Sequence, residues 1–145
     1  MKLQTRTMGE IEIKEEDIIT FGTGIPGFEE YSKYIIVTPD TSIPFNYLQS
    51  VEDSNLSFIV TDPFVFYPSY DINIPDEVLE ELRIEKPEHV AVYSIVTIKN
   101  SLNQATLNLL APIALNITNK CAKQVILTDT KYRTKHSIFN SESGA

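Results

Sequence analysis

The sequence has no tryptophan and is poor in the residues that do most chemistry, with one cysteine and two histidines among 145 residues. The single cysteine, Cys121, excludes an internal disulfide, and it has no Cys or His near it at the spacing of a zinc site. We therefore expect a buried or half-buried, inert thiol. Histidine supplies most acid-base groups near neutral pH. Because His89 precedes a core-like run and His136 opens a polar tail, we interpret both as surface histidines.

Motifs of common enzymes are also missing, including the G-x-S-x-G turn of hydrolases and the H-E-x-x-H of zinc proteases. The stretch FGTGIPGF places Gly22, Gly24 and Gly27 at G-x-G-x-x-G spacing. However, Pro26 interrupts the pattern, no helix-opening pattern follows, and no βαβ unit surrounds it. We interpret the glycines as a tight turn with positive φ angles, stiffened by Pro26. The sequence therefore predicts no catalytic, cofactor-binding or metal site.

Long hydrophobic runs are lacking as well. The longest strongly apolar run, Leu109 to Leu115, contains Pro112 and falls far short of the roughly 20 residues that span a bilayer. The first residues, MKLQTRTMGEIEIKEED, contain no apolar core of a signal peptide. We expect a cytoplasmic protein without a membrane partner. The length fits one domain, which we assign to residues 1–138, followed by a flexible tail at residues 139–145.

Positive charge is scarce over most of the chain, which has a formal net charge of -8. Residues 1–110 carry 18 acids and 7 bases, whereas residues 111–145 carry 2 acids and 5 bases. Nucleic-acid binding needs cations that neutralise phosphates, so direct RNA or DNA binding is disfavoured. We interpret the sparse basic group as a solvated surface strand; it comprises Lys120, Lys123, Lys131, Arg133 and Lys135.

What the sequence has in abundance is strand-like patterning. Apolar residues alternate with polar ones, as expected of half-buried strands, over residues 9–13, 57–61, 70–74 and 106–110. More continuous apolar runs, typical of strands covered on both faces, occupy residues 34–37, 90–98 and 124–127. The spacing predicts a mainly β, single-domain, small β-barrel-like fold of about eight to ten antiparallel strands.

Helix-like patterning is limited to one or two short segments. PDEVLEELRI, residues 75–84, begins with proline and acids and places Val78, Leu79 and Leu82 at helical spacing. We predict a helix there that covers the sheet. A second helical turn is predicted after Pro26, through FEEYSKY, with Phe28 and Tyr31 directed inward.

An unusual share of the aromatic residues lies in TDPFVFYPSYDI, residues 61–72. The four rings belong to Phe64, Phe66, Tyr67 and Tyr70. Pro63 and Pro68 lack a backbone N–H, which excludes the stretch from a central strand and favours an edge or rim position. In an extended conformation, successive side chains face opposite ways. We therefore expect Phe66 to point inward and Tyr67 outward.

Rigid aromatic side chains flanked by acids are typical of a protein-protein contact surface. Asp62 and Asp71 bracket the stretch, and we interpret them as groups for a partner's basic side chains rather than as catalytic or calcium-binding groups. The alternative is a barrel cap in which all four rings pack inward. The sequence does not separate the two arrangements for Phe64 and Phe66. It disfavours inward packing of Tyr67 and Tyr70, because tyrosine hydroxyls prefer a wet or hydrogen-bonded position.

Several pieces in a fixed order resemble the family of flagellar assembly factors called FliW. They are FGTGIPGFEEY at residues 21–31, LQS at 48–50, FIVTDPFVFYPSYDI at 58–72, LNLLAPIALN at 107–116, KQVIL at 123–127 and YRTKH at 132–136. The segment after His136 departs from the pattern. The resemblance implies a β-barrel-like protein, monomeric when free and without enzymatic activity. It also implies a switch between two partners: the RNA-binding regulator CsrA, whose repression of flagellin translation it relieves, and flagellin itself.

Taken with the resemblance, these patterns yield a predicted set of partner-binding residues. The set is Asp62, Phe64, Phe66, Tyr67, Tyr70, Asp71, Ile25 and Phe28. The alternative function is an enzyme or a small-molecule-binding barrel, with its mouth near Gly24 to Phe28. No convergent polar residues in the sequence support that alternative.

Overall fold

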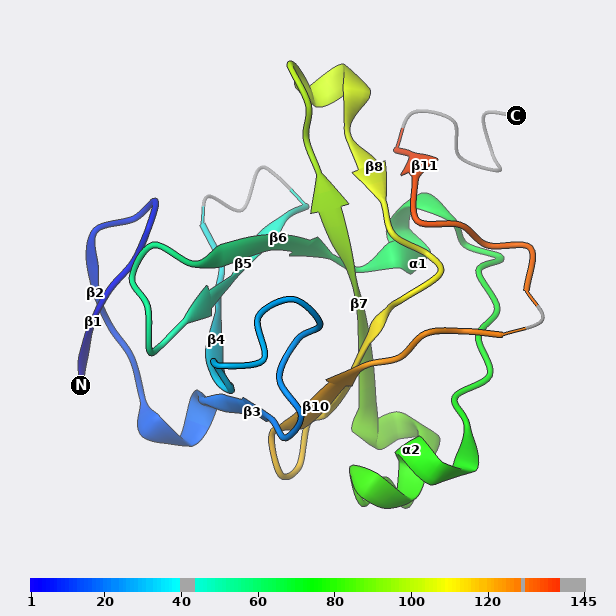
Figure 1. Cartoon of the computed structure of the whole chain (residues 1–145), viewed down its shortest axis with the longest axis horizontal. Coiled ribbons are helices and arrows are strands. Elements are labelled where there is room, and N and C mark those ends of the chain that lie inside the picture. The colour runs from blue at the N-terminus through cyan, green and yellow to red at the C-terminus, as the bar shows by residue number, and fades with distance from the viewer. Residues whose placement is uncertain (40–43, 129, 139–145) are drawn as a thin grey trace.

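A computed structural model of the chain describes residues 1–39, 44–128 and 130–138. Most of the described chain is made of short strands, with a few short helices between them (Figure 1). In chain order the elements are β1 (Lys2–Gln4), β2 (Glu10–Glu12), η1 (Glu15–Asp17), β3 (Ile19–Phe21), β4 (Lys33–Val37), β5 (Asn46–Ser50), β6 (Ser57–Thr61), α1 (Pro63–Phe66), α2 (Asp76–Glu81), η2 (Pro87–His89), β7 (Val90–Thr97), η3 (Leu102–Gln104), β8 (Thr106–Leu107), β9 (Ile113–Asn116), β10 (Cys121–Gln124) and β11 (His136–Ser137).

Seven strands close into a barrel. Each is paired with the next in the order β3, β4, β5, β6, β7, β9 and β10, and β10 pairs with β3 to close the ring. The mainly β, barrel-like prediction is confirmed, and the structure assigns eleven strands in the described ranges. The expectation that all strands are antiparallel is wrong for one pair, because β10 runs parallel to β3. A closed ring with an odd number of strands cannot alternate direction throughout, so one parallel pair is unavoidable.

The interior of the barrel holds the main core. Its buried members are Ile19, Phe21, Ile25, Tyr34, Leu48, Val60, Ile113, Leu115 and Ala122. On β4, Tyr34 points into this core, whereas Ile35 and Val37 pack outside the barrel against Leu3 and Ile13, which belong to the β1–β2 hairpin and the residues after it. Burial on both faces explains the continuous apolar run at residues 34–37, as predicted for a covered strand.

Two strand predictions differ from the structure. Residues 70–74, read as alternating, form no strand but an irregular connection between α1 and α2. Of the run predicted at residues 124–127, only Gln124 belongs to β10. The next residues still form hydrogen bonds, because the N–H groups of Val125 and Leu127 donate to the carbonyls of Pro112 and Leu110 at 2.8 and 2.9 Å. Alternating hydrophobicity reports which side chains are buried, and an irregular segment with tertiary contacts produces the same pattern.

The glycine-rich stretch is a turn, as predicted, with φ of +75° at Gly24 and +89° at Gly27. The helical turn expected after Pro26 is wrong, since Ile25 and Phe28 instead form an isolated β-bridge. A Cβ on Gly24 would lie 2.6 Å from the Cα of Glu29, so the turn folds tightly against itself. It lies within the outline of the barrel in Figure 1 and inserts Ile25 into the core.

Candidate functional site

The aromatic stretch begins with a short helix instead of an extended strand, so that prediction is wrong. Pro63 occupies the first turn of α1, and the Asp62 carboxylate accepts a hydrogen bond from the Phe64 N–H at 2.9 Å. Asp followed by Pro is a favourable helix start, because Asp satisfies a free N–H and Pro has no N–H that needs a partner. The Asp62–Pro63 pair is a helix-start signal in the sequence, and it explains why Pro63 opens a helix here instead of only ending a strand.

Because this segment is helical, the prediction that Phe66 points inward and Tyr67 points outward is wrong. Both side chains are half-buried. The Phe66 ring lies 6.2 Å from the ring of Phe45, between centroids. The Tyr67 hydroxyl donates to the Ser137 carbonyl, and its ring packs edge-on against His136 at 5.7 Å. Tyr67 therefore anchors α1 to β11, whereas the sequence prediction directed it outward.

Tyr70 is also anchored in the fold. Its side chain is only 4% exposed, and its hydroxyl donates to the Leu109 carbonyl at 2.7 Å. Its ring lies 4.7 Å from that of Tyr132, whose hydroxyl accepts from the Asp71 N–H at 2.9 Å. Burial raises the pKa of the Tyr70 hydroxyl above its usual range. The prediction that disfavours inward packing of Tyr70 is wrong, because the Leu109 carbonyl supplies the partner that a buried hydroxyl needs.

Helix α1 exposes a small apolar surface. Phe64 is 39% exposed and Val65 is 59% exposed. Both flanking acids of the predicted surface, Asp62 and Asp71, are exposed as well. Of the predicted residues around α1, Asp62, Phe64 and Asp71 are exposed, and Val65, which was not predicted, is exposed with them.

An apolar groove of about 440 Å³ runs from α1 to α2. Its apolar walls come from Phe64, Ile72, Ile74, Leu79, Ile84 and Val92. We call it the α1–α2 groove. The helix predicted at residues 75–84 is confirmed as α2, which buries Val78 in the cluster that also contains Leu82 and Val125. Leu79, predicted to lie at the core-facing helical spacing, is only half-buried and instead forms part of a groove wall.

The other two predicted residues, Ile25 and Phe28, lie at a different place. Ile25 is 2% exposed and presents no surface to a partner. Phe28 packs edge-on against Phe58, at the start of β6, with ring centroids 5.2 Å apart. Because α1 begins after the end of β6, the predicted residues fall into two groups at opposite ends of one strand.

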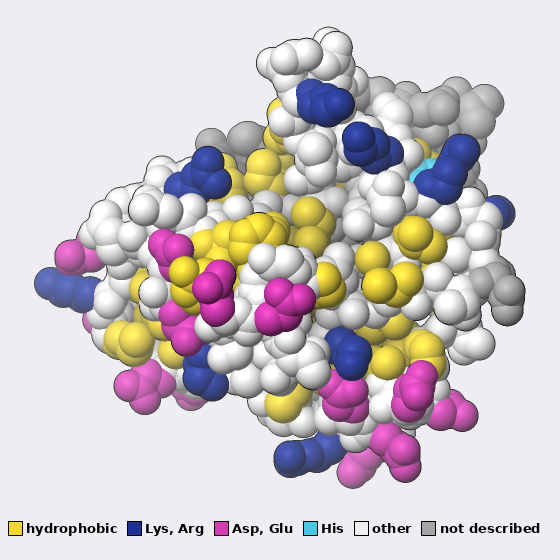
Figure 2. Space-filling model, viewed as in Figure 1, with side chains coloured by type: hydrophobic (Ala, Val, Ile, Leu, Met, Phe, Trp, Pro, Cys, Tyr) yellow, Lys and Arg dark blue, Asp and Glu magenta, His cyan; other side chains and the backbone are white. Residues whose placement is uncertain are grey.

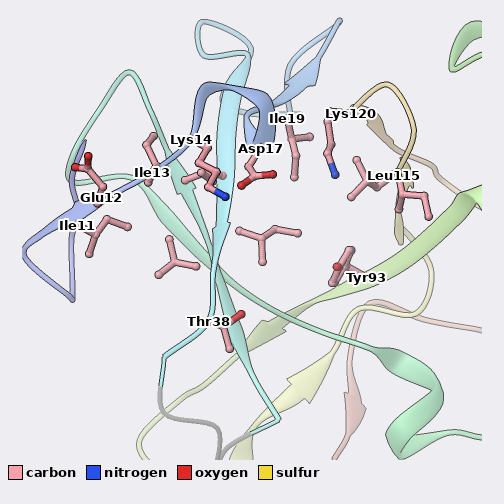
Figure 3. Close-up of a pocket in the computed structure, with 14 residues that line it drawn as sticks. Ile11, Glu12, Ile13, Lys14, Asp17, Ile19, Thr38, Tyr93, Leu115 and Lys120 are labelled. Carbon is pink, nitrogen blue, oxygen red and sulfur yellow. The ribbon is translucent and has the colours of Figure 1, made fainter. Parts of the chain in front are cut away.

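A second hollow, of about 500 Å³, opens at a mouth of the barrel (Figure 3). Its apolar wall includes Ile19, Tyr93 and Leu115, and charged residues stand at its rim. In Figure 3 the Lys120 side chain points into the hollow. The small-molecule alternative expected a mouth near Gly24 to Phe28, but there the turn itself fills the barrel with Ile25. The rim combines Lys14 and Lys120 with Glu12 and Asp17, so it has no clear preference for one charge.

Neither histidine belongs to a cluster with catalytic geometry. His136 lies in β11 and not in a tail, and its Nε2 accepts the Arg133 N–H at 2.8 Å. Burial, together with the nearby Arg133 charge, lowers the pKa of His136. His89 ends η2, on another part of the chain. In the described ranges no three His, Cys, Asp or Glu side chains gather to hold a metal, and no helix is long and apolar enough to span a bilayer.

Charge is unevenly spread over the surface. Figure 2 shows basic side chains along the upper part of the view, and acidic side chains at its foot and left of its centre with a few basic ones among them. Within residues 62–88, which include α1 and α2, the sequence has eight acids and two bases. The charged residues that line the α1–α2 groove itself are Glu85 and Lys86.

Comparison with known proteins matches nearly the whole chain. The sequence model of the FliW protein family matches residues 2–138. The flagellar assembly factor FliW of Alkaliphilus metalliredigens is 47% identical over 140 residues, which cover 96% of this chain and 86% of that protein. The corresponding protein of Geobacillus thermodenitrificans is 43% identical, with 96% of both chains covered. A crystal structure of the flagellar assembly factor FliW superimposes with a TM-score of 0.89 at 41% identity, covering 95% of this chain and 96% of the other.

Proposed function

The chain belongs to the FliW family of flagellar assembly factors, and from this premise we propose that it acts in the cytoplasm by binding protein partners and not by catalysis. Its proposed partners are CsrA, an RNA-binding regulator that represses translation of flagellin messenger RNA, and flagellin. Bound CsrA is prevented from repressing flagellin synthesis. When flagellin accumulates it occupies the protein, and repression returns.

The observation that carries the proposal is the family match over residues 2–138, with high coverage in both directions. The surface is compatible with partner binding, because α1 exposes Phe64 and Val65 between Asp62 and Asp71. Aromatic side chains in such positions supply large contact areas at a small cost in conformational entropy. The four accessible residues form the core of the proposed contact surface.

The negative charge of the chain supports the proposal that it reduces the binding of RNA to CsrA. Residues 1–110, with 18 acids and 7 bases, repel phosphate groups. A complex of CsrA with this acidic chain would place negative charge beside the RNA-binding surface of CsrA. We propose that the chain does not itself bind RNA, and that it disfavours RNA on CsrA with an effect that weakens as salt rises.

Flagellin and CsrA are proposed to exclude each other. Their footprints overlap on part of Asp62 to Asp71, or they favour different conformations of that segment. A domain of this size rarely exposes two separate large apolar patches. Linkage is reciprocal, so each partner weakens the binding of the other by the same factor.

The test is a titration of flagellin into a preformed complex with CsrA, followed by size-exclusion chromatography. The proposal predicts two binary complexes, or one binary complex with flagellin together with free CsrA. A stable ternary peak with both partners at saturating concentration would exclude competition. Absence of binding to either partner would overturn the proposed function as a whole.

A further inference from the structure

A basic hollow lies beside β11 and includes two members of the basic group noted in the sequence. Its volume is about 340 Å³, within the range of small-molecule sites. Three of its six described lining residues are Lys, Arg or His and none is acidic, although the chain has a formal net charge of -8. We call it the β11 hollow; its lining residues are Tyr67, Ser69, Lys131, Tyr132, Arg133 and His136.

The backbone around the β11 hollow is fixed by the fold. Strand β11 pairs with β8 through His136 and Leu107. The Arg133 carbonyl accepts hydrogen bonds from the N–H groups of Leu109 and Leu110, both at 3.1 Å. The Arg133 N–H donates in turn to the Nε2 atom of His136 at 2.8 Å. The walls are therefore held in place before a ligand arrives, which lowers the entropic cost of binding.

His136 and Tyr132 each have a hydrogen-bond donor to spare. Because the Nε2 atom of His136 accepts the Arg133 N–H, the proton of the neutral imidazole is on Nδ1. No group in residues 1–39, 44–128 and 130–138 accepts a hydrogen bond from this Nδ1–H. The Tyr132 hydroxyl accepts the Asp71 N–H at 2.9 Å, and no described residue accepts the hydrogen of that hydroxyl.

The two cations of the β11 hollow have no acidic partner in the described part of the chain. Lys131 and Arg133 are exposed, and neither forms an ion pair there. The Lys131 ammonium lies 5.7 Å from the centroid of the Tyr132 ring, a contact that leaves its charge in place. Lys131, Tyr132, Arg133 and His136 thus all offer donors, and two of them carry a positive charge. Such a set matches an oxyanion, whose oxygens only accept hydrogen bonds.

Aromatic rings complete the walls of the β11 hollow. The His136 ring lies 5.7 Å from the Tyr67 ring and 6.1 Å from the Tyr132 ring, between centroids, and both pairs are edge-on. Aromatic side chains provide a large apolar surface with a preference for stacked or edge-on ring contacts. The donors are therefore adjacent to a surface that suits a flat apolar group.

We propose that the β11 hollow binds a small organic oxyanion, in which a phosphate or carboxylate group is joined to a flat apolar body. The oxyanion pairs with Lys131, Arg133 and the Nδ1–H of His136, and the apolar body lies against the two tyrosine rings. Charge favours this location, because residues 111–145 carry 2 acids and 5 bases, whereas residues 1–110 carry 18 acids and 7 bases. The proposal does not depend on the protein partners proposed above.

The first test is an NMR titration of the amides of the natural chain with phenyl phosphate and with benzoate, which separate a phosphate ligand from a carboxylate ligand. The Arg133 amide should shift, because an anion at Nδ1 polarises the imidazole that accepts its hydrogen bond. We expect a dissociation constant of about 1 mM or lower for at least one of the two. Shifts spread evenly over all basic residues, or none near β11, would overturn the proposal.

Two further ligands test the two halves of the proposed molecule. Benzyl alcohol has the ring without the charge, and inorganic phosphate has the charge without the ring. Each should bind at least about tenfold more weakly than the better of the two anions in the first test. Equal binding of inorganic phosphate would mean an adventitious ion only, and equal binding of benzyl alcohol would mean that the basic residues do not contribute.

A matched pair of double variants tests the two cations. Lys131→Gln with Arg133→Gln should raise the dissociation constant at least about tenfold, because it removes both charges of the β11 hollow. Arg6→Gln with Lys99→Gln makes the same change at exposed positions that do not line it, and should change affinity less than about threefold. Thermal melts check that both variants are folded. Equal losses would show that only the net charge of the chain matters, and would overturn the assigned site.

His136 gives a readout that does not depend on the stability of a variant. Burial and the Arg133 charge lower its pKa in the free protein. A bound anion favours the charged imidazolium, so the pKa of His136, followed by NMR, should rise at saturating phenyl phosphate or benzoate. An unchanged pKa at saturation would show that the anion does not contact His136.

Asp129 provides the last test. It is the only acid among residues 125–138 of the sequence and lies outside the described residues. Asp129→Asn should change the affinity for the better anion by less than about threefold. A larger gain in affinity would show that the Asp129 carboxylate itself occupies the donors, and would overturn the assignment to a free ligand.

Discussion

The turn at Gly24 to Phe28 and the helix α1 share proline and aromatic residues, but the structure places their apolar side chains differently. Each combines Pro with aromatic and branched residues, and both were predicted to contact partners. The turn inserts Ile25 into the barrel, where it is 2% exposed. Helix α1 leaves Val65 59% exposed. Phe28 of the turn is 37% exposed, so the contrast concerns Ile25 and Val65. It shows that composition alone does not distinguish an apolar side chain that enters the barrel from one that stays exposed.

Backbone geometry explains the difference. Positive φ angles at two glycines and a 2.7 Å bond from the Phe28 N–H to the Ile25 carbonyl fold the turn back into the barrel. Helix α1 has only four residues, beginning at the buried Pro63, and one helical turn distributes its side chains around the axis. It therefore cannot bury all its apolar residues against one surface. The predictions below test this contrast, from the largest expected effect to the smallest.

Replacement of Gly24 by alanine should have the largest effect on stability. The new Cβ would lie 2.6 Å from the Glu29 Cα, at a residue with φ of +75°. We expect a loss of about 3 kcal/mol or more in the free energy of unfolding, measured by denaturant titration. Gly22→Ala is the control, since its Cβ meets no atom within 4 Å, and should cost less than about 1 kcal/mol. Equal losses would show that the turn does not depend on its close packing.

Ile25→Ala should reduce stability without changing partner binding, whereas Val65→Ala should weaken partner binding with little effect on stability. Truncation of the buried Ile25 should cost about 2–5 kcal/mol of unfolding free energy and leave partner affinity unchanged in the folded protein. Val65→Ala should cost less than about 0.5 kcal/mol but weaken partner binding by about 1 kcal/mol or more. Melting curves and titrations on both variants check this reciprocity. A stability loss at Val65 equal to that at Ile25 would mean that α1 is part of the core.

Removal of one hydroxyl tests whether the aromatic stretch is anchored as the structure indicates. Tyr70→Phe leaves the Leu109 carbonyl without its 2.7 Å donor in a buried site, and should cost about 1–3 kcal/mol of unfolding free energy. Tyr67→Phe removes a bond to Ser137 at a half-buried site, and should cost about 0.5–1.5 kcal/mol. Urea titrations compare the two. The reverse order would contradict the deeper anchoring of Tyr70.

The smallest expected effect is a pH dependence through His136, next to Tyr67. Its pKa is lowered in the folded state by burial and by Arg133. The unfolded chain therefore takes up a proton first as pH falls, so this contribution to stability is full above about pH 6.5 and declines below it. Melting temperatures measured between about pH 7.5 and about pH 5.5 should fall less steeply for His136→Asn than for the natural chain. Identical slopes would show that His136 does not contribute.

Much of the barrel was predictable from the sequence, because burial on one or both faces leaves a direct pattern. The strands predicted at residues 57–61 and 90–98 correspond to β6 and β7 in the structure. The helix predicted from its acidic start is α2, which begins at Asp76. The parallel pairing of β10 with β3 was not predictable, since it follows from the number of strands in the closed ring. It joins segments about 100 residues apart, and local patterns carry no information on such pairing.

The candidate site was predictable in part. The exposed residues of α1 lie within the aromatic stretch that was singled out, but the groove beside it was missed. The groove depends on the left-handed Arg83 and on Asn116, which joins β9 to the end of α2. An arginine in a position that usually favours glycine gives no sequence signal. Long-range hydrogen bonds of this kind are visible only in the folded structure.

Amide hydrogen exchange in the presence and absence of CsrA tests the central claim most directly. If the exposed residues of α1 bind the partner, peptides covering residues 62–71 should exchange more slowly in the complex. Peptides covering the turn at residues 22–31 and the barrel mouth at residues 11–19 should be unchanged. Protection of the turn or the mouth, with none over residues 62–71, would contradict the account.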